Sequence, residues 1–171
     1  MDDKKKVGTP PGVEIRYTEP GDVKYLKAWL LEPETGCWFP MDDQIEVEDA
    51  AVRWIAFHRY KCSLTVLKDG IPCGLATLYL QPYRKLAHQC EFGIIMGKDY
   101  RNQGVGTYLM SSIMHLAKEK FKIEIMHLQV YAGNPAIHFY QKFGFNEFGR
   151  QNNWIKEKNG YFGRVFMERF L

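Results

Sequence analysis

Residues 100–106 read Tyr-Arg-Asn-Gln-Gly-Val-Gly, and a helix-patterned segment follows them directly. Arg101, Gly104 and Gly106 have the spacing R-x-x-G-x-G at the start of that helix. Glycine lets a backbone approach a ligand closely, and the first turn of a helix offers unpaired N–H groups and the positive end of its dipole. Arg101 adds a cation in the same turn. The stretch therefore predicts a binding site for a phosphate-bearing cofactor.

Two better-known glycine loops do not match this spacing. The ATP-type loop requires G-x-x-x-x-G-K-[ST], and no lysine stands between Gly106 and Thr107. The dinucleotide fingerprint requires G-x-G-x-x-G after a first strand, whereas this loop has the reverse order of spacing and lies past mid-chain. A helix start whose glycines only form a turn stays open as an alternative.

Length and composition indicate one globular domain. The chain has 171 residues, of which 46% are hydrophobic. We expect residues 1–12 to form a flexible tail and residues 13–171 to form the domain. The net charge of +3 is too small to indicate nucleic-acid binding, but residues 98–171 carry 11 Lys and Arg against 6 Asp and Glu. The glycine loop lies in this positive part, which suits a polyanionic cofactor.

No segment has the features of a secretory signal or of a membrane span. The chain begins Met-Asp-Asp-Lys-Lys-Lys, and no apolar run approaches the ~18 residues that a span needs. The cysteines at 37, 62, 73 and 90 form no C-x-x-C or Cys/His cluster. We therefore expect a cytoplasmic protein with reduced thiols and with no metal, membrane or nucleic-acid partner. Its oligomeric state stays open, a homodimer included.

The spacing of apolar residues predicts alternating strands and helices. Strands are expected at 13–18, 62–67, 71–80, 90–96, 123–131, 145–152 and 161–170, and helices at 23–31, at 47–60, from 105 onward and from 134 to 144.

Particular residues add turns and a topology to this pattern. Asp69-Gly70 and Asn159-Gly160 predict hairpin turns, and Gly93 inside its strand suggests a bulge or a close backbone approach. Strands 90–96 and 123–131 flank one helix, so they should be parallel neighbours. The predicted class is α/β (α+β), a mixed and mostly antiparallel sheet of six to seven strands with helices on both faces.

Three segments, in this order, resemble motifs of the GCN5-related N-acetyltransferase superfamily. They are Cys-Glu-Phe-Gly-Ile-Ile-Met at 90–96, Arg-Asn-Gln-Gly-Val-Gly at 101–106 and Asn-Pro-Ala-Ile-His-Phe-Tyr-Gln-Lys-Phe-Gly-Phe at 134–145. The resemblance implies a single N-acetyltransferase domain in which the central parallel strands splay apart. It also implies an enzyme that moves an acetyl group from acetyl-CoA to a primary amine by direct attack.

The resemblance assigns cofactor-binding residues as well. In the loop, the amides that would hold the pyrophosphate of acetyl-CoA are those of Arg101, Asn102, Gln103, Gly104, Val105, Gly106 and Thr107. The backbone of Ile94, Ile95 and Met96 would pair with the pantetheine arm, as if the arm were an added strand in the gap. Asn134 would reach the arm from the opposite side.

Two residues are candidates for the acid–base chemistry. A lysine-like amine with a pKa of ~10.4 is mostly protonated at pH 7, so a base has to take its proton. By resemblance Glu91 is the candidate base; ordered water in its place, or a solvent-facing strand carboxylate, are the open alternatives. Tyr140 stands where the family has the acid that protonates the departing thiolate, and its alternative role is apolar packing beside Phe139 and Phe143.

The acceptor is less well indicated. Seven acids and no Lys or Arg lie between Glu32 and Val52, a segment that borders the acceptor site in this family. An acidic rim would attract a cationic amine such as a polyamine, an aminoglycoside or a basic peptide, whereas a solvated helix with acids near its N-terminus is the alternative. Trp38-Phe39-Pro40 either packs or lines an acceptor pocket. A non-catalytic acyl-CoA sensor on the same fold also stays open, although Glu91 and Tyr140 favour an enzyme.

Overall fold

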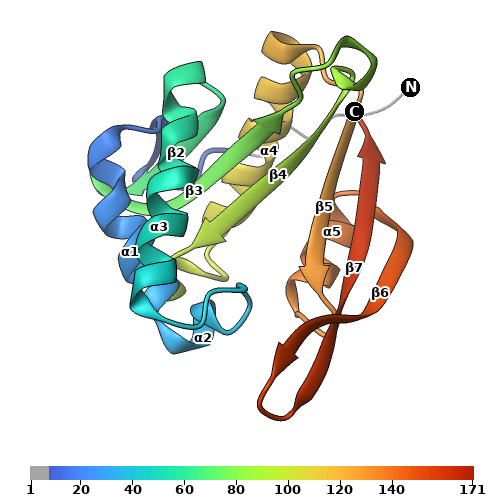
Figure 1. Ribbon diagram of the computed structural model, residues 1–171. Coiled ribbons are helices and arrows are strands. Elements are labelled where there is room, and N and C mark those ends of the chain that lie inside the picture. Colours follow the sequence, from blue (N-terminus) through green and yellow to red (C-terminus); the bar gives the residue numbers. More distant parts are fainter. Residues whose placement is uncertain (1–7) are drawn as a thin grey trace.

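The computed structural model describes residues 8–171, which form one seven-stranded sheet (Figure 1). Its strand order is β1-β2-β3-β4-β5-β7-β6, and all neighbours are antiparallel except β4 and β5. The strands are β1 (Val13–Tyr17), β2 (Ser63–Lys68), β3 (Ile71–Leu80), β4 (Gln89–Met96), β5 (Ile125–Tyr131), β6 (Asn146–Glu157) and β7 (Gly160–Phe170). The predicted α/β class, with a mixed and mostly antiparallel sheet around one parallel pair, is confirmed.

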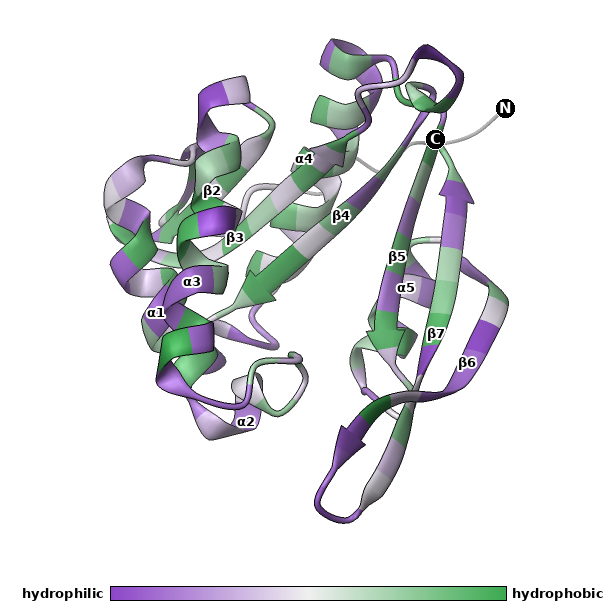
Figure 2. Ribbon diagram, in the orientation of Figure 1, coloured by the Kyte–Doolittle hydropathy of each residue, from purple (hydrophilic) through white to green (hydrophobic). Residues whose placement is uncertain are grey.

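Helices cover both faces of the sheet. They are α1 (Val23–Leu31), α2 (Pro33–Gly36), α3 (Gln44–Ile55), α4 (Val105–Phe121) and α5 (Ala136–Lys142). Figure 1 shows α1 and α3 in front of β2–β4, with α4 and α5 behind the sheet. Within residues 8–171, the front face of β5, β7 and β6 carries no helix. This arrangement makes two apolar clusters, one under α1 and α3 and a larger one between the sheet and α4. Figure 2 shows that apolar residues are concentrated on β3 and the C-terminal half of β4, which both clusters share.

Most predicted boundaries agree with the structure, and the differences have local causes. The predicted helix 47–60 begins earlier, at Gln44, because Asp43 Oδ1 accepts from the Glu46 N–H at 2.8 Å and Glu46 Oε2 accepts from the Asp42 N–H at 2.8 Å. Its end, Ala56–Tyr60, is a 3₁₀ helix. Helix α2 was not predicted, since four residues are too few for a periodic pattern.

The two hairpin turns differ in outcome. The Asp69-Gly70 turn is confirmed: Lys68 pairs with Ile71, and both turn residues have positive φ angles of 50° and 80°. The second turn is formed by Lys158 and Asn159, one residue before the predicted pair, because Gly160 already pairs with Glu157.

The parallel strands separate after a short contact. β4 pairs with β5 only from Gln89 to Glu91, and beyond this point β4 stays with β3 while β5 stays with β7. Gly93 keeps a regular register with Thr77, so no bulge interrupts the pairing with β3. A Cβ at Gly93 would stand 2.7 Å from Tyr79 Oη. The close backbone approach, rather than the bulge, therefore explains this glycine.

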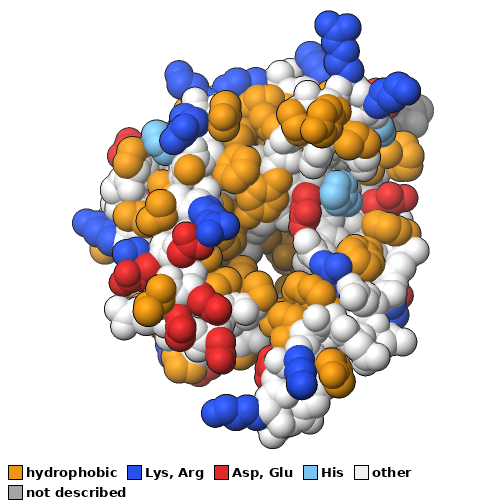
Figure 3. Space-filling view, viewed as in Figure 1, with side chains coloured by type: hydrophobic (Ala, Val, Ile, Leu, Met, Phe, Trp, Pro, Cys, Tyr) orange, Lys and Arg blue, Asp and Glu red, His pale blue; other side chains and the backbone are white. Residues whose placement is uncertain are grey.

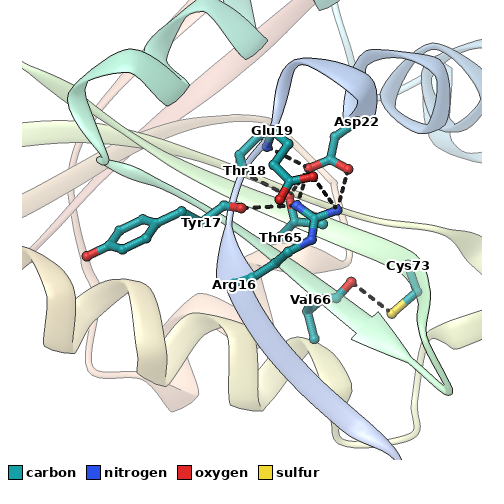
Figure 4. A network of polar contacts seen from close by, with 8 residues as sticks. All are labelled: Arg16, Tyr17, Thr18, Glu19, Asp22, Thr65, Val66 and Cys73. Atoms are coloured by element: carbon teal, nitrogen blue, oxygen red, sulfur yellow. Dashed lines mark hydrogen bonds and ion pairs between the residues drawn. The ribbon is translucent and has the colours of Figure 1, made fainter.

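An ion pair between half-buried Arg16 and buried Asp22 joins β1 to the turn that precedes α1 (Figure 4). Arg16 binds Asp22 through two hydrogen bonds of 2.7 and 2.8 Å, and Asp22 is 2% exposed. The carboxylate also accepts from the Glu19 N–H at 3.0 Å and from the Thr65 hydroxyl at 2.8 Å. Burial alone would raise the pKa of Asp22, but these donors outweigh it and the pKa is lowered.

Of the predicted tail, residues 1–12, the first seven residues lie outside the part of the chain that the structure describes. In the described part, the Val13 N–H donates to the Pro10 carbonyl at 3.1 Å. The Asp69 N–H donates to the Gly12 carbonyl at 2.8 Å, which attaches this segment to the β2–β3 turn. No helix within residues 8–171 combines the length and the apolar character that crossing a membrane would take.

Candidate active site

A cleft of about 1230 Å³ opens where β4 and β5 separate. Figure 3 shows it as a hollow in the middle of the front face. All but two of the predicted site residues line this cleft. The predicted residues that line it are Glu91, Ile94, Ile95, Met96, Arg101, Asn102, Gly104, Gly106, Thr107, Asn134 and Tyr140. Segments from the middle and the end of the chain, which the sequence alone could not place together, thus meet in one cavity.

Gln103 and Val105 are the two that do not line the cleft. The Gln103 side chain donates to the Asp99 carbonyl at 2.7 Å, and Val105 is buried in the core at 1% exposure. The prediction for both concerned their backbone amides rather than their side chains. For these amides it stays a prediction.

The glycine loop has the backbone shape of an anion site. Asn102 and Gly104 have positive φ angles of 60° and 79°, which turn the chain into the first residue of α4, Val105. Helix α4 is 17 residues long, so its first turn presents unpaired N–H groups and a full dipole to the cleft. Gly106 has no positive φ, and a Cβ there would make an ordinary contact of 3.5 Å with Met96 Cγ. Neither backbone conformation nor packing requires this glycine, and the close approach of a ligand stays a prediction.

Arg101 lines the cleft, and its side chain is held by residues outside the loop. Its guanidinium donates to the Met96 carbonyl at 3.1 Å from Nη2 and 3.3 Å from Nε, and it also donates to the Thr35 hydroxyl. Thr35 is buried and donates in turn to Glu32 Oε2 at 2.8 Å. These contacts fix Arg101 between the end of β4 and α2, and its role toward a phosphate stays a prediction.

The alternation of side chains along β4 separates the two candidate catalytic residues. Ile95 packs in the cluster under α1 and α3, whereas Phe92 packs in the cluster next to α4. Since successive strand residues face opposite sides, Glu91 faces the α1–α3 side. Tyr140 packs on Phe92 at 6.1 Å between ring centroids, on the other side. The gap between β4 and β5 connects these two sides of the sheet, so Glu91 and Tyr140 line the same cleft.

Glu91 is half-buried and has polar neighbours from two strands. Its Oε1 accepts a hydrogen bond of 2.8 Å from Gln129 Nε2. His127 on β5 and Tyr79 on β3 are its register partners. Burial raises the pKa of Tyr79, and the nearby Glu91 charge adds to the shift. Burial lowers the pKa of His127, with Glu91 and Glu168 opposing this. Burial thus favours the neutral forms of Tyr79 and His127, the two register partners of Glu91.

Tyr140 lies in the last turn of α5, and Asn134 lies two residues before the helix begins. Tyr140 contacts Phe139 and Phe145 at centroid distances of 5.7 and 6.2 Å, and burial raises its pKa. Its phenol therefore carries a proton at neutral pH, which is compatible with both packing and proton donation. Asn134 Oδ1 accepts from the Ala136 N–H at 2.8 Å, as expected of a capping residue, and the side chain still lines the cleft.

Aromatic residues enclose one end of the cleft. The loop after α2 crosses toward β5, where Trp38 meets the Tyr131 ring edge-on at 6.2 Å and the Phe39 carbonyl accepts from Tyr131 Oη at 3.3 Å. Tyr131 also meets Trp154 of β6 at 5.0 Å. The sequence had offered Trp38 and Phe39 as pocket residues, but it gave no sign of Tyr131 and Trp154. Only the pairing of β5, β7 and β6 brings these two together.

The seven acids of the 32–52 segment have mostly local partners. Asp43 and Glu46 cap α3, Asp49 pairs with Arg53 at 2.7 Å, and Glu48 lies 3.8 Å from Lys27. All seven belong to the described residues and none of them lines the cleft, although Figure 3 shows acidic side chains gathered over α2 and α3 beside it. The geometry thus fits the alternative of solvated, helix-capping acids. Within residues 8–171, no group of three or more His, Cys, Asp or Glu could hold a metal ion.

Two curated proteins resemble the chain in sequence. The L-amino acid N-acetyltransferase AaaT of Escherichia coli is 28% identical over 163 residues, which cover 92% of this chain and 97% of that protein. An N-alpha-acetyltransferase of Sulfurisphaera tokodaii is 41% identical over 64 residues, 37% of each protein.

Solved structures of similar fold cover nearly the whole chain. A ribosomal-protein-alanine N-acetyltransferase from Brucella melitensis has a TM-score of 0.79 at 21% identity, over 92% of this chain and 99% of its own. The protein yncA of Salmonella typhimurium, solved with its cofactor acetyl-CoA, has a TM-score of 0.75 at 16% identity, over 94% of each chain. The model of the acetyltransferase (GNAT) family matches residues 19–145, the part that builds the loop and the cleft. The chain therefore belongs to the acetyltransferase (GNAT) family and is an acyltransferase.

Proposed function

We propose that this enzyme transfers the acetyl group of acetyl-CoA to an α-amine that carries an apolar side chain, as in an amino acid or a peptide N-terminus. The observation that carries the proposal is the composition of the cleft. Among residues 8–171, Glu91 is the one acidic residue that lines the cleft, and Trp38, Phe39, Tyr131 and Trp154 enclose one of its ends. The two curated relatives are named for L-amino acids and for N-alpha-acetylation, which also supports an α-amine.

The energetics of deprotonation favour the same class of amine. An α-amine with a pKa near 7.7–8.0 loses its proton at pH 7 at a cost of about 1 kcal/mol, whereas a lysine-like amine costs ~4–5 kcal/mol. Apolar walls disfavour a second charge on the acceptor, since burying an unpaired cation is costly. Lys142 also lines the cleft and would repel a polyamine. A single carboxylate is therefore matched to a single, weakly basic amine.

The residues present fit acetyl-CoA. The edge of β4 that faces the gap has no strand partner at Ile94–Met96, so its backbone groups can pair with an extended arm. The 101–107 loop and the start of α4 offer N–H groups to a diphosphate, and a Cβ at Gly106 would occupy space beside them. When bound, acetyl-CoA supplies the activated acyl group. Glu91 accepts the amine proton on one side of the gap, and Tyr140 holds a proton on Oη on the other.

The test is a panel of amines with acetyl-CoA and detection of the released thiol. We expect leucinamide and similar α-amines to be better acceptors than spermidine or an ε-amine. Tyr140→Phe should lower kcat by ~10²-fold or more, the usual contribution of a general acid, without changing the affinity for CoA. Tyr161→Phe, an exposed tyrosine on β7, is the matched control. Heat of CoA binding without thiol release on any amine would instead support a non-catalytic sensor.

A further inference from the structure

Three side chains from three strands form a hydrogen-bonded series that ends on the candidate base. Gln129 on β5 donates from Nε2 to Glu91 Oε1 on β4 at 2.8 Å. Gln129 Oε1 in turn accepts from Nη1 of Arg164 on β7. Glu91 and Gln129 line the cleft, and Arg164 lies over the ring of Trp154, which lines it as well. The series therefore crosses the place where β4 and β5 begin to separate.

The chemistry of arginine fixes the orientation of the amide. A guanidinium has five N–H donors and no acceptor, so only the oxygen of Gln129 can face Arg164. The NH₂ group must then face Glu91, and the carboxylate receives a donor rather than a competing oxygen. Arg164 is itself held in place. Its Nε donates to Gln151 Oε1 at 2.9 Å, and its guanidinium lies 4.9 and 4.7 Å from the ring centroids of Trp154 and Phe166.

We propose that Gln129 is a positioning residue that holds the carboxylate of Glu91 at the cleft. Arg164 acts through Gln129, because it fixes the orientation of the Gln129 amide. The inference rests on the proposed function, in which Glu91 takes the proton of the acceptor amine. Without Gln129, Glu91 loses the donor that stabilises its charged form. A hydrogen bond to the charged form of an acid favours that form.

Other charged or titratable groups face Glu91 and have to be separated from this effect. They are Tyr79 on β3, His127 on β5 and, beyond His127, Glu168 on β7. Tyr79 stays protonated across the accessible pH range because burial raises its pKa. His127 is the group that could imitate an acidic limb in a pH profile. The variant His127→Gln removes this limb if the limb belongs to the imidazole, and leaves it if the limb belongs to Glu91.

The experiment compares kcat/KM against pH for the wild type, Gln129→Met, Arg164→Met and Arg164→Lys, with leucinamide as acceptor. In Gln129→Met we expect the acidic limb of the profile to move to higher pH, and kcat/KM at pH 7 to fall about 5- to 10-fold, as for the loss of one hydrogen bond to a charged group. The KM for acetyl-CoA should not change. Arg164→Met should show a smaller shift of the same sign, and Arg164→Lys, which also only donates, should restore most of it. Gln44→Met, an exposed amide at the start of α3, is the control.

A wild-type pH profile in Gln129→Met would overturn the inference. The same would follow if Arg164→Met and Arg164→Lys behaved alike. An NMR titration of the Glu91 carboxyl carbon reads the shift without turnover, by comparing the wild type with Gln129→Met. If the wild type acetylates no amine, the proposed function fails, whereas the NMR titration still decides the positioning role.

Discussion

The replacement Gly106→Ala should separate cofactor binding from stability, because the two are expected to change in opposite directions. Gly106 is the second residue of α4 and has no positive φ, and its Cβ would be in ordinary contact with Met96. Alanine in a helix is favoured over glycine by roughly 0.5–1 kcal/mol. With a shift of about 2–4 °C per kcal/mol in a chain of this size, the Tm should stay constant or rise by ~1–3 °C.

Binding should weaken in the same variant. The added methyl group stands in the cleft wall where we expect the diphosphate to approach the loop amides. Overpacking of this kind costs about 1–3 kcal/mol, which corresponds to roughly 5- to 150-fold in Kd. Isothermal calorimetry with CoA and thermal unfolding measure the two effects. Gly21→Ala is the matched control, since a Cβ there meets nothing within 4 Å and lies far from the cleft lining. Unchanged CoA affinity in Gly106→Ala would refute the close approach, and a Tm loss of several degrees would refute the packing argument.

Two further predictions concern stability and thiol chemistry. Asp22→Asn should destabilise the fold by about 2–4 kcal/mol in denaturant unfolding, because it leaves the Arg16 charge without its carboxylate partner. The pKa of Asp22 is lower in the folded than in the unfolded state. The ionised carboxylate therefore contributes its full share to the free energy of unfolding above the unfolded pKa of ~3.9, and this share is lost as the pH falls through the folded pKa. The difference in unfolding free energy between wild type and Asp22→Asn should shrink only in strong acid. Of the four thiols, Cys37 is exposed, whereas burial raises the pKa of Cys62 and Cys73 to about 11 and that of Cys90 to about 12. Ellman's reagent at pH 8 should titrate one thiol in the native protein and four in denaturant, and rapid reaction of more than one native thiol would contradict the buried core.

The parts of the fold that the sequence predicted well are those with a local cause. Helix α1 and strand β3 have the predicted boundaries because apolar periodicity and a two-residue turn define them without help from distant residues. The glycine loop is of the same kind, since R-x-x-G-x-G specifies positive φ at Gly104 and a helix start within seven residues. Helix α2 and the turn at Lys158-Asn159 were missed or misplaced because one is too short for a pattern and the other depends on strand register.

The contacts of the Arg101 side chain show why side-chain partners are harder to predict than backbone geometry. Its position in the motif predicts a phosphate-binding cation, which stays a prediction, whereas the partners that hold its side chain are the last carbonyl of β4 and Thr35, 66 residues earlier in the chain. No sequence window contains both residues. The same argument applies to the acids of the 32–52 segment. Their number suggested an electrostatic rim, and their contacts show that several of them cap or brace helices.

The acceptor end of the cleft is the extreme case, and it explains why the acceptor stayed open at the sequence level. Trp38, Phe39, Tyr131 and Trp154 come from a loop and from two strands, and none of them belongs to a recognisable motif. Tyr131 links all the others: it contacts Trp38 and Trp154 through its ring and the Phe39 carbonyl through its hydroxyl. These contacts depend on β7 lying between β5 and β6, which places Trp154 beside a strand that it does not pair with. If this end of the cleft receives the amine, as we propose, specificity depends on topology, whereas the glycine loop depends on local sequence; relatives could then keep the loop while changing the acceptor.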